Sequence, residues 1–156
     1  MPPYDDEVQA SLTDGLLDET ERQLGVRLPE SLVALLRWQN GGYLQVGFPE
    51  GRDYNTTHDM IRGIGPKFPC LEKGAWWHDD DDFEPRPPDA EWLIPFDGDG
   101  HWDLCLDYRR SPSDRSGLRT HPAVVVIDTE EHGPNIESFV AASFDGYLAQ
   151  LVSDDR

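Results

Sequence analysis

The feature of the sequence with the strongest chemical character is a concentration of carboxylates between residues 72 and 107. Twelve acidic and two basic residues fall in this span, a local charge of −10 in a chain whose net charge is −18. Aromatic side chains beside acidic ones suit a basic protein surface, because charge speeds association and the rings supply buried area. We therefore predict a partner-binding surface, with a solvated loop of like charges as the alternative. The predicted partner-binding surface comprises Trp76, Trp77, Asp79, Asp80, Asp81, Asp82, Phe83 and Glu84.

Three acidic residues in the same span have the spacing of a calcium loop. Asp97, Asp99 and Asp103 fall at the first, third and seventh positions of such a loop. Other positions do not fit, because Trp102 stands at the glycine position and Tyr108 at the position of the last glutamate. A hairpin turn with solvent-facing acids is the simpler interpretation, so we expect no metal and no other cofactor.

Nucleophilic catalysis has no recognisable motif in this chain. A hydrolase needs a serine or cysteine beside a positioned base, and Ser138, Ser143, Cys70 and Cys105 lack that context. Paired carboxylates carry little information in a chain with 31 acidic residues. We predict that the protein is not an enzyme and assign no catalytic residues, with a metal-dependent enzyme using the acidic middle as the alternative.

The charge balance limits the partners. With 31 acidic against 13 basic residues, the chain should be repelled by nucleic acids and by anionic membranes. No apolar run approaches the ~20 residues of a membrane helix, and the N-terminus lacks the features of a signal peptide. We expect a cytoplasmic protein with a single domain over residues 1–156, and its oligomeric state stays open.

The elements that position these groups follow from hydrophobic periodicity. Leucines on one face predict a helix from Thr13 or Asp14 to a stop at Gly25. A second helix follows Leu28-Pro29 and ends at Asn40-Gly41-Gly42, after which residues 43–48 alternate as a strand. Both helices are amphipathic, so each should pack one face against a core.

The second half of the chain predicts strands and a final helix. Residues 92–96 and 101–108 form a predicted hairpin around the Asp97–Gly100 turn, and residues 123–128 predict a central strand beside it. The alternation in 101–108 is typical of a half-buried strand. Ser143 is a predicted cap for a terminal helix, whereas residues 49–89 suggest loops with short elements. The order predicts an α+β fold with helices packed on a mostly antiparallel (mixed) sheet.

Four segments in order resemble the SUKH superfamily, which includes fungal cell-wall-assembly regulators and bacterial immunity proteins. They are residues 17–31 with Gln39-Asn40-Gly41-Gly42, residues 92–107, residues 122–130 and residues 141–148, so the similarity spans about residues 12–152. The positions that carry it are structural: Gly25, Leu28, Pro29, Asn40, Gly41, Gly42, Pro95, Phe96 and Phe144.

The resemblance implies an α+β domain that binds another protein. In bacteria the expected partner is a cognate toxin, often a nuclease, blocked by stoichiometric binding. A nuclease must present a cationic groove, so an acidic inhibitor could occupy it. A regulatory or scaffold protein of the same fold is the alternative. The acidic region 72–90 departs from the commoner family pattern, which leaves the identity of the partner open.

Overall fold

The computed structural model describes residues 8–43, 46–47, 60–67, 69–79, 86–98, 101–130 and 136–153. These residues form an α+β fold, as the sequence predicts. The helices are α1 (Asp14–Leu24), α2 (Glu30–Trp38), α3 (Trp76–Asp79) and α4 (Phe144–Leu148). The strands are β1 (Gly42–Tyr43), β2 (Val46–Gly47), β3 (Met60–Ile61), β4 (Leu93–Gly98), β5 (Trp102–Asp107), β6 (Ala123–Asp128), β7 (Glu137–Ala141) and β8 (Val152–Ser153).

Strands β4 to β7 form a four-stranded antiparallel sheet in the order β4-β5-β6-β7. Shorter antiparallel pairs join β1 to β3 and β2 to β8. The predicted pairing of β5 with β6 is confirmed, and Pro95 lies in the edge strand β4 as expected for a residue without an N–H. No helix in the described part of the chain is long and apolar enough to cross a membrane.

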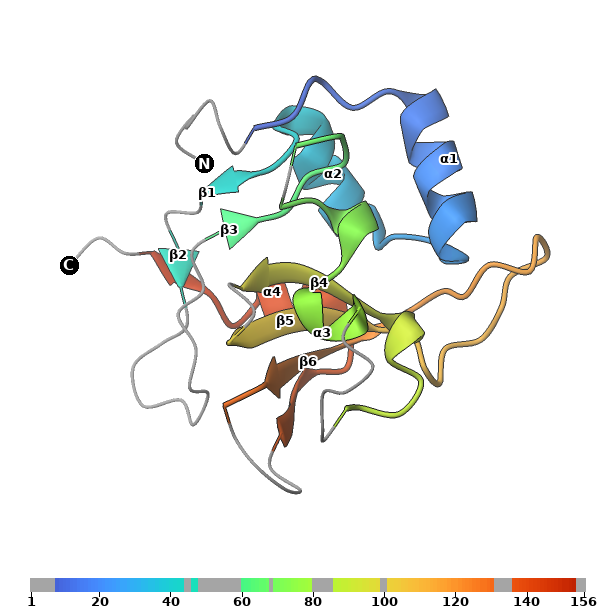
Figure 1. The fold of residues 1–156 in the computed structure, drawn as a ribbon. Coiled ribbons are helices and arrows are strands. Elements are labelled where there is room, and N and C mark those ends of the chain that lie inside the picture. Colours follow the sequence, from blue (N-terminus) through green and yellow to red (C-terminus); the bar gives the residue numbers. More distant parts are fainter. Residues whose placement is uncertain are drawn as a thin grey trace.

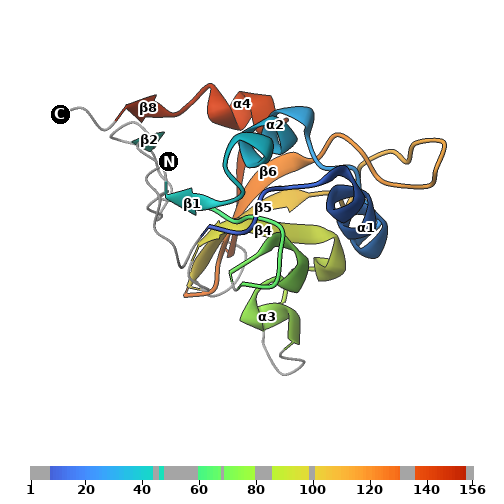
Figure 2. The same cartoon turned by 90° about the horizontal axis from the view of Figure 1, so that it is seen from above.

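The sheet lies between two layers. Helices α1, α2 and α4 lie on one side of it and α3 on the other (Figures 1 and 2). The larger core joins α1, α2 and α4 to the sheet. In it the rings of Phe96 and Phe144 meet edge to face, with their centroids 5.6 Å apart. The smaller core contains Ala75, Trp77, Ala90, Leu93, Cys105, Val125, Ile127 and Ile136.

The second layer changes the environment of β5. The sequence predicted a half-buried strand, but Asp103, Leu104, Cys105 and Leu106 are all fully buried. The prediction is wrong because it assumed that one face meets solvent, whereas the segment around α3 covers that face. A central strand with both faces covered loses the burial contrast between alternate residues.

Two caps define α1 as predicted. The Thr13 hydroxyl accepts the Leu16 N–H at 3.2 Å, and Gly25 adopts φ +75° at the C-terminal end. The buried Glu21 carboxylate accepts the Leu28 N–H at 2.8 Å, so α1 holds the start of the segment that enters α2. This contact ties the C-terminal half of α1 to the residue that precedes Pro29 and α2.

Asn40 joins three segments at the end of α2. Its side-chain amide donates to the carbonyls of Ala10 and Ile64, both at 2.8 Å, and its Oδ1 accepts the Ile64 N–H at 2.9 Å. Its backbone carbonyl accepts the Gln9 N–H at 2.9 Å. These contacts need two N–H donors and one acceptor oxygen on the same side chain, which an amide supplies. The Asn-Gly-Gly motif is therefore a structural joint.

The Asn40 joint predicts a sharp difference between two glycines. A Cβ added at Gly63 would lie 2.4 Å from the Asn40 carbonyl oxygen, whereas one at Gly15 meets nothing within 4 Å. We expect Gly63→Ala to lower the free energy of unfolding by about 1–3 kcal/mol. Gly15→Ala should raise it by up to about 1 kcal/mol, because Gly15 lies within α1. Urea unfolding measures both, and equal effects would contradict this packing.

Candidate functional site

The predicted partner-binding residues divide into three groups. Trp76 and Asp79 lie exposed on α3, with 48% of the Trp76 side chain accessible. Trp77 is fully buried. Asp80, Asp81, Asp82, Phe83 and Glu84 lie outside the described residues. The described part of the candidate site is therefore its base, formed by α3 and the residues from Arg86 onward.

Trp77 anchors this base to the sheet. Its indole Nε1 donates to the buried Asp103 carboxylate on β5 at 2.9 Å, and its ring stacks on His78 with centroids 4.0 Å apart. A buried tryptophan needs such a partner for its N–H. Our prediction of a surface role for Trp77 is therefore corrected: the ring packs inside the protein, and its contribution to the surface is to hold α3 in place.

His78 ties α3 to the start of β4. Its Nδ1 accepts the Ala75 N–H at 3.1 Å, and its Nε2 lies 3.0 Å from both the Ala90 and the Leu93 carbonyl oxygens. Carbonyl oxygens only accept hydrogen bonds, so Nε2 carries the proton of the neutral ring. Both ring nitrogens are engaged by the backbone, which makes His78 a structural residue.

Arg86, which follows the acidic residues in the chain, contacts the backbone of α3. Its guanidinium donates to the Trp77 carbonyl from Nε at 3.2 Å and from Nη2 at 2.9 Å, and also to the His78 carbonyl. These are carbonyls at the C-terminal end of a short helix, where a cation is favourable. Because Arg86 contacts α3 directly, the two ends of the acidic segment, residues 79 and 86, are held together at one place.

The acidic residues of the region do not all face solvent. Among the described ones, Asp79, Asp89 and Glu91 are exposed, whereas Asp97 and Asp103 are fully buried. The local charge of −10 therefore overstates the charge available to a partner. Among the described residues of this region, the exposed carboxylates lie on α3, at Asp79, and just before β4, at Asp89 and Glu91.

The candidate calcium ligands serve the fold. Asp97 accepts the Gly98 N–H at 2.7 Å and the Met60 N–H at 3.4 Å, and Asp103 Oδ1 lies 3.7 Å from Nη2 of the buried Arg62. Both side chains are fully buried, which corrects the expectation of solvent-facing acids, and Asp99 lies outside the described residues. Across the described ranges, no three His, Cys, Asp or Glu side chains gather where they could hold a metal ion.

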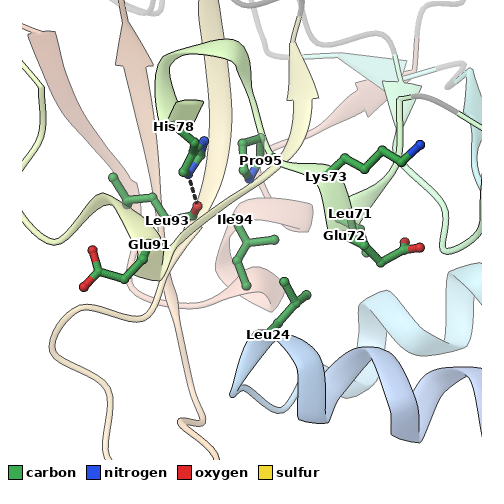
Figure 3. Close-up of a pocket in the computed structure, with 10 residues that line it drawn as sticks. Leu24, Leu71, Glu72, Lys73, His78, Glu91, Leu93, Ile94 and Pro95 are labelled. Carbon is green, nitrogen blue, oxygen red and sulfur yellow. Dashed lines mark hydrogen bonds between the residues drawn. The ribbon is translucent and has the colours of Figure 1, made fainter. Parts of the chain in front are cut away.

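A small hollow lies beside His78 (Figure 3). Its volume is about 190 Å³, and Glu72 and Lys73 line one side of it while Glu91 lies at the other. Burial raises the pKa of Glu72, although the Gly65 N–H, which donates to this carboxylate, opposes the change. The hollow is smaller than the roughly 300–1,000 Å³ of typical small-molecule sites.

The cysteines are poorly placed for nucleophilic chemistry. Cys70 and Cys105 are both free and buried. Burial raises the pKa of each thiol, and for Cys105 the nearby Asp103 carboxylate adds to the effect. Since the thiolate is the nucleophile, neither side chain is activated at neutral pH.

Two exposed aromatic residues were missed by sequence reasoning. Trp38 at the end of α2 is 75% exposed, and Phe139 on β7 is 65% exposed. Trp38 lies two residues after the buried Leu36 and so falls outside the buried face of α2. Phe139 pairs with the buried Val125, but β7 lacks the alternation that would have revealed it.

The sequence profile of the SMI1/KNR4 family (SUKH-1) matches residues 11–150. This chain belongs to the SMI1/KNR4 (SUKH-1) family. The matched range contains the Asn40 joint, the Glu21 contact, the whole four-stranded sheet and the α3 base. No curated protein and no solved structure matches the chain significantly. The resemblance drawn from the sequence is thus confirmed at the level of the SUKH superfamily.

The α3 base predicts different roles for two adjacent tryptophans of this SUKH-1 protein. Trp77→Phe removes the donor to the buried Asp103 carboxylate and should lower the free energy of unfolding by about 1.5–3 kcal/mol. Trp76→Phe changes a half-exposed ring and should alter it by less than about 0.5 kcal/mol. Denaturant titration of both variants checks this. A Trp77→Phe protein as stable as the Trp76→Phe control would contradict the anchoring role.

Proposed function

We propose that this SUKH-1 protein is a bacterial immunity protein that binds and neutralises a cognate toxin domain in a stoichiometric complex. The observation that carries the proposal is the α3 base, where Trp77, His78 and Arg86 fix the two ends of the acidic segment against the sheet. These hydrogen bonds, one of them buried, hold α3 and Arg86, the described residues on either side of the acidic segment. Membership of a superfamily that includes immunity proteins supports the same function.

The chemistry of the surface favours a basic partner. Asp79, Asp89 and Glu91 are exposed at the base, and the half-exposed Trp76 lies among them. Acidic groups steer a cationic surface into contact, whereas an exposed tryptophan supplies apolar area at the centre of an interface. A nuclease domain, which needs a cationic groove for phosphates, has the matching charge.

Binding is better supported than catalysis. The buried thiols have raised pKa values, both nitrogens of His78 contact the backbone, and Asp97 and Asp103 are held by hydrogen bonds within the fold. The side chains in this region that could act as nucleophiles, bases or metal ligands are therefore engaged in maintaining the structure. Among the described residues at the base, the exposed side chains Asp79, Asp89, Glu91 and Trp76 suit recognition.

A charge-matched pair of variants tests the proposal. Replacing Asp79–Asp82 by serine should weaken binding to the toxin domain encoded in the adjacent gene by roughly 10–100-fold at physiological salt, because exposed ion pairs contribute about 0.2–1 kcal/mol each. The control variant makes the same change in charge on exposed acids elsewhere: Asp18→Ser, Glu19→Ser, Glu30→Ser and Asp145→Ser. Isothermal titration calorimetry measures both affinities.

Co-expression gives the functional readout for the same two variants. The wild-type protein and the control should rescue growth of cells that express the toxin domain, and the Asp79–Asp82 variant should rescue poorly. Equal rescue and equal affinity for the two variants would contradict the acidic-segment interface. A chain without a toxin gene beside it, and without effect on toxin activity, would favour the regulatory alternative.

A further inference from the structure

The segment between β5 and β6 carries the opposite charge from the rest of the chain. Residues 109–121 hold four arginines and one aspartate, a local charge of +3, so the remaining residues carry −21. The segment projects from one end of the molecule beside α1, away from α3 (Figures 1 and 2). We refer to residues 109–121 as the basic hairpin.

The basic hairpin is tightly held by hydrogen bonds. The Asp114 N–H donates to the Leu118 carbonyl at 2.8 Å, and the Asp114 carboxylate accepts the N–H groups of Ser116 and Leu118 at 2.8 and 3.1 Å. Arg27 donates to the same carboxylate at 3.0 Å, which lowers the pKa of Asp114. The tip of the hairpin therefore has a defined shape before it meets a ligand.

The base of the basic hairpin is fixed as well. The Arg119 guanidinium donates to the Tyr108 and Arg109 carbonyls, both at 3.1 Å, and stacks 3.7 Å above the Trp92 ring. Its backbone N–H and carbonyl bond to Gly25 and Arg27 at the end of α1. Arg109 is bound by Asp107 and Glu137. These two arginines are structural.

The two remaining arginines of the basic hairpin face solvent. Arg110 and Arg115 are exposed and make no hydrogen bond or ion pair with any residue that the structure describes. Next to the tip, Arg22 and Arg27 of the α1 region line a hollow of about 350 Å³ together with Ser116 and Leu118. Its acidic lining residue is Asp18. Three exposed arginines, Arg22, Arg110 and Arg115, thus lie on or next to the basic hairpin of a strongly acidic protein.

We propose that the basic hairpin is a second binding surface, which takes a short acidic segment of a protein. The cations Arg110, Arg115 and Arg22 would meet carboxylates of that segment, and the preformed hairpin would limit the entropy lost on binding. The surface lies apart from the α3 base, so it does not depend on the function proposed for the acidic segment.

The charge of the whole molecule decides between a protein segment and a nucleic acid. A long polyanion bound at the basic hairpin would extend over the remaining surface, which carries −21, and would be repelled. A segment of a few residues fits on the hairpin alone. The same repulsion acts against a second copy of this chain, whose net charge is also −18.

Fluorescence anisotropy with a labelled hexaglutamate peptide tests this proposal at low salt. The wild-type protein should bind the peptide, and Arg110→Ser combined with Arg115→Ser should weaken binding about tenfold, as expected for two exposed ion pairs. The matched control, Arg37→Ser with Lys73→Ser, changes the net charge equally at exposed sites elsewhere and should bind as the wild type does.

Four results would overturn the proposal. Three are no binding of the peptide, equal weakening in both double variants, and equally tight binding of a six-nucleotide single-stranded DNA. Self-association measured by analytical ultracentrifugation gives a fourth: a dimer that disappears in the Arg110/Arg115 variant would assign the hairpin to a second copy. Weaker peptide binding by the Arg110/Arg115 variant alone, together with intact toxin rescue by that variant, supports the proposal and leaves the acidic-segment interface unaffected.

Discussion

The arrangement of the molecule depends on a carboxylate, Asp103, buried in the middle of the sheet. A buried charge is costly unless hydrogen bonds and an opposite charge compensate it. Trp77 supplies a hydrogen bond from α3, and Arg62 lies 3.7 Å away while donating to the Gly74 carbonyl at 2.7 Å. The need to compensate one charge therefore brings the β3 region, the approach to α3 and the central strand together.

The SUKH-1 scaffold and the two charged segments have separate physical roles. Asn40 and Glu21 use their side chains to join backbone segments on the helical side of the sheet. On the other side, the acidic segment begins and ends at contacts made by His78 and Arg86. The basic hairpin is held by Arg119 in the same way. Part-buried hydrogen bonds thus fix the described ends of the acidic segment and the base of the basic hairpin.

Local signals in the sequence predicted much of this structure. The Thr13 cap, the Gly25 stop and the bounds of β6 were readable because each depends on residues close in the chain. The layer that α3 forms on the second face of the sheet could not be predicted. Trp77 and Asp103, which join it to the sheet, are 26 positions apart, and the residues around one do not indicate the other. The alternation around Asp103 even suggested a solvent-facing strand. In the candidate site, the exposed Asp79 could be predicted from its charge, but two adjacent tryptophans with opposite environments could not be told apart by type.

Hydrogen–deuterium exchange of the protein, free and bound to the toxin domain proposed as its partner, tests the central claim most directly. The claim is that the surface at the α3 base meets the partner. We expect binding to slow exchange in peptides that cover residues 76–91, while the peptides of α1 and α2 exchange as they do in the free protein. Slowed exchange confined to α1 and α2, with residues 76–91 unchanged, would contradict the account.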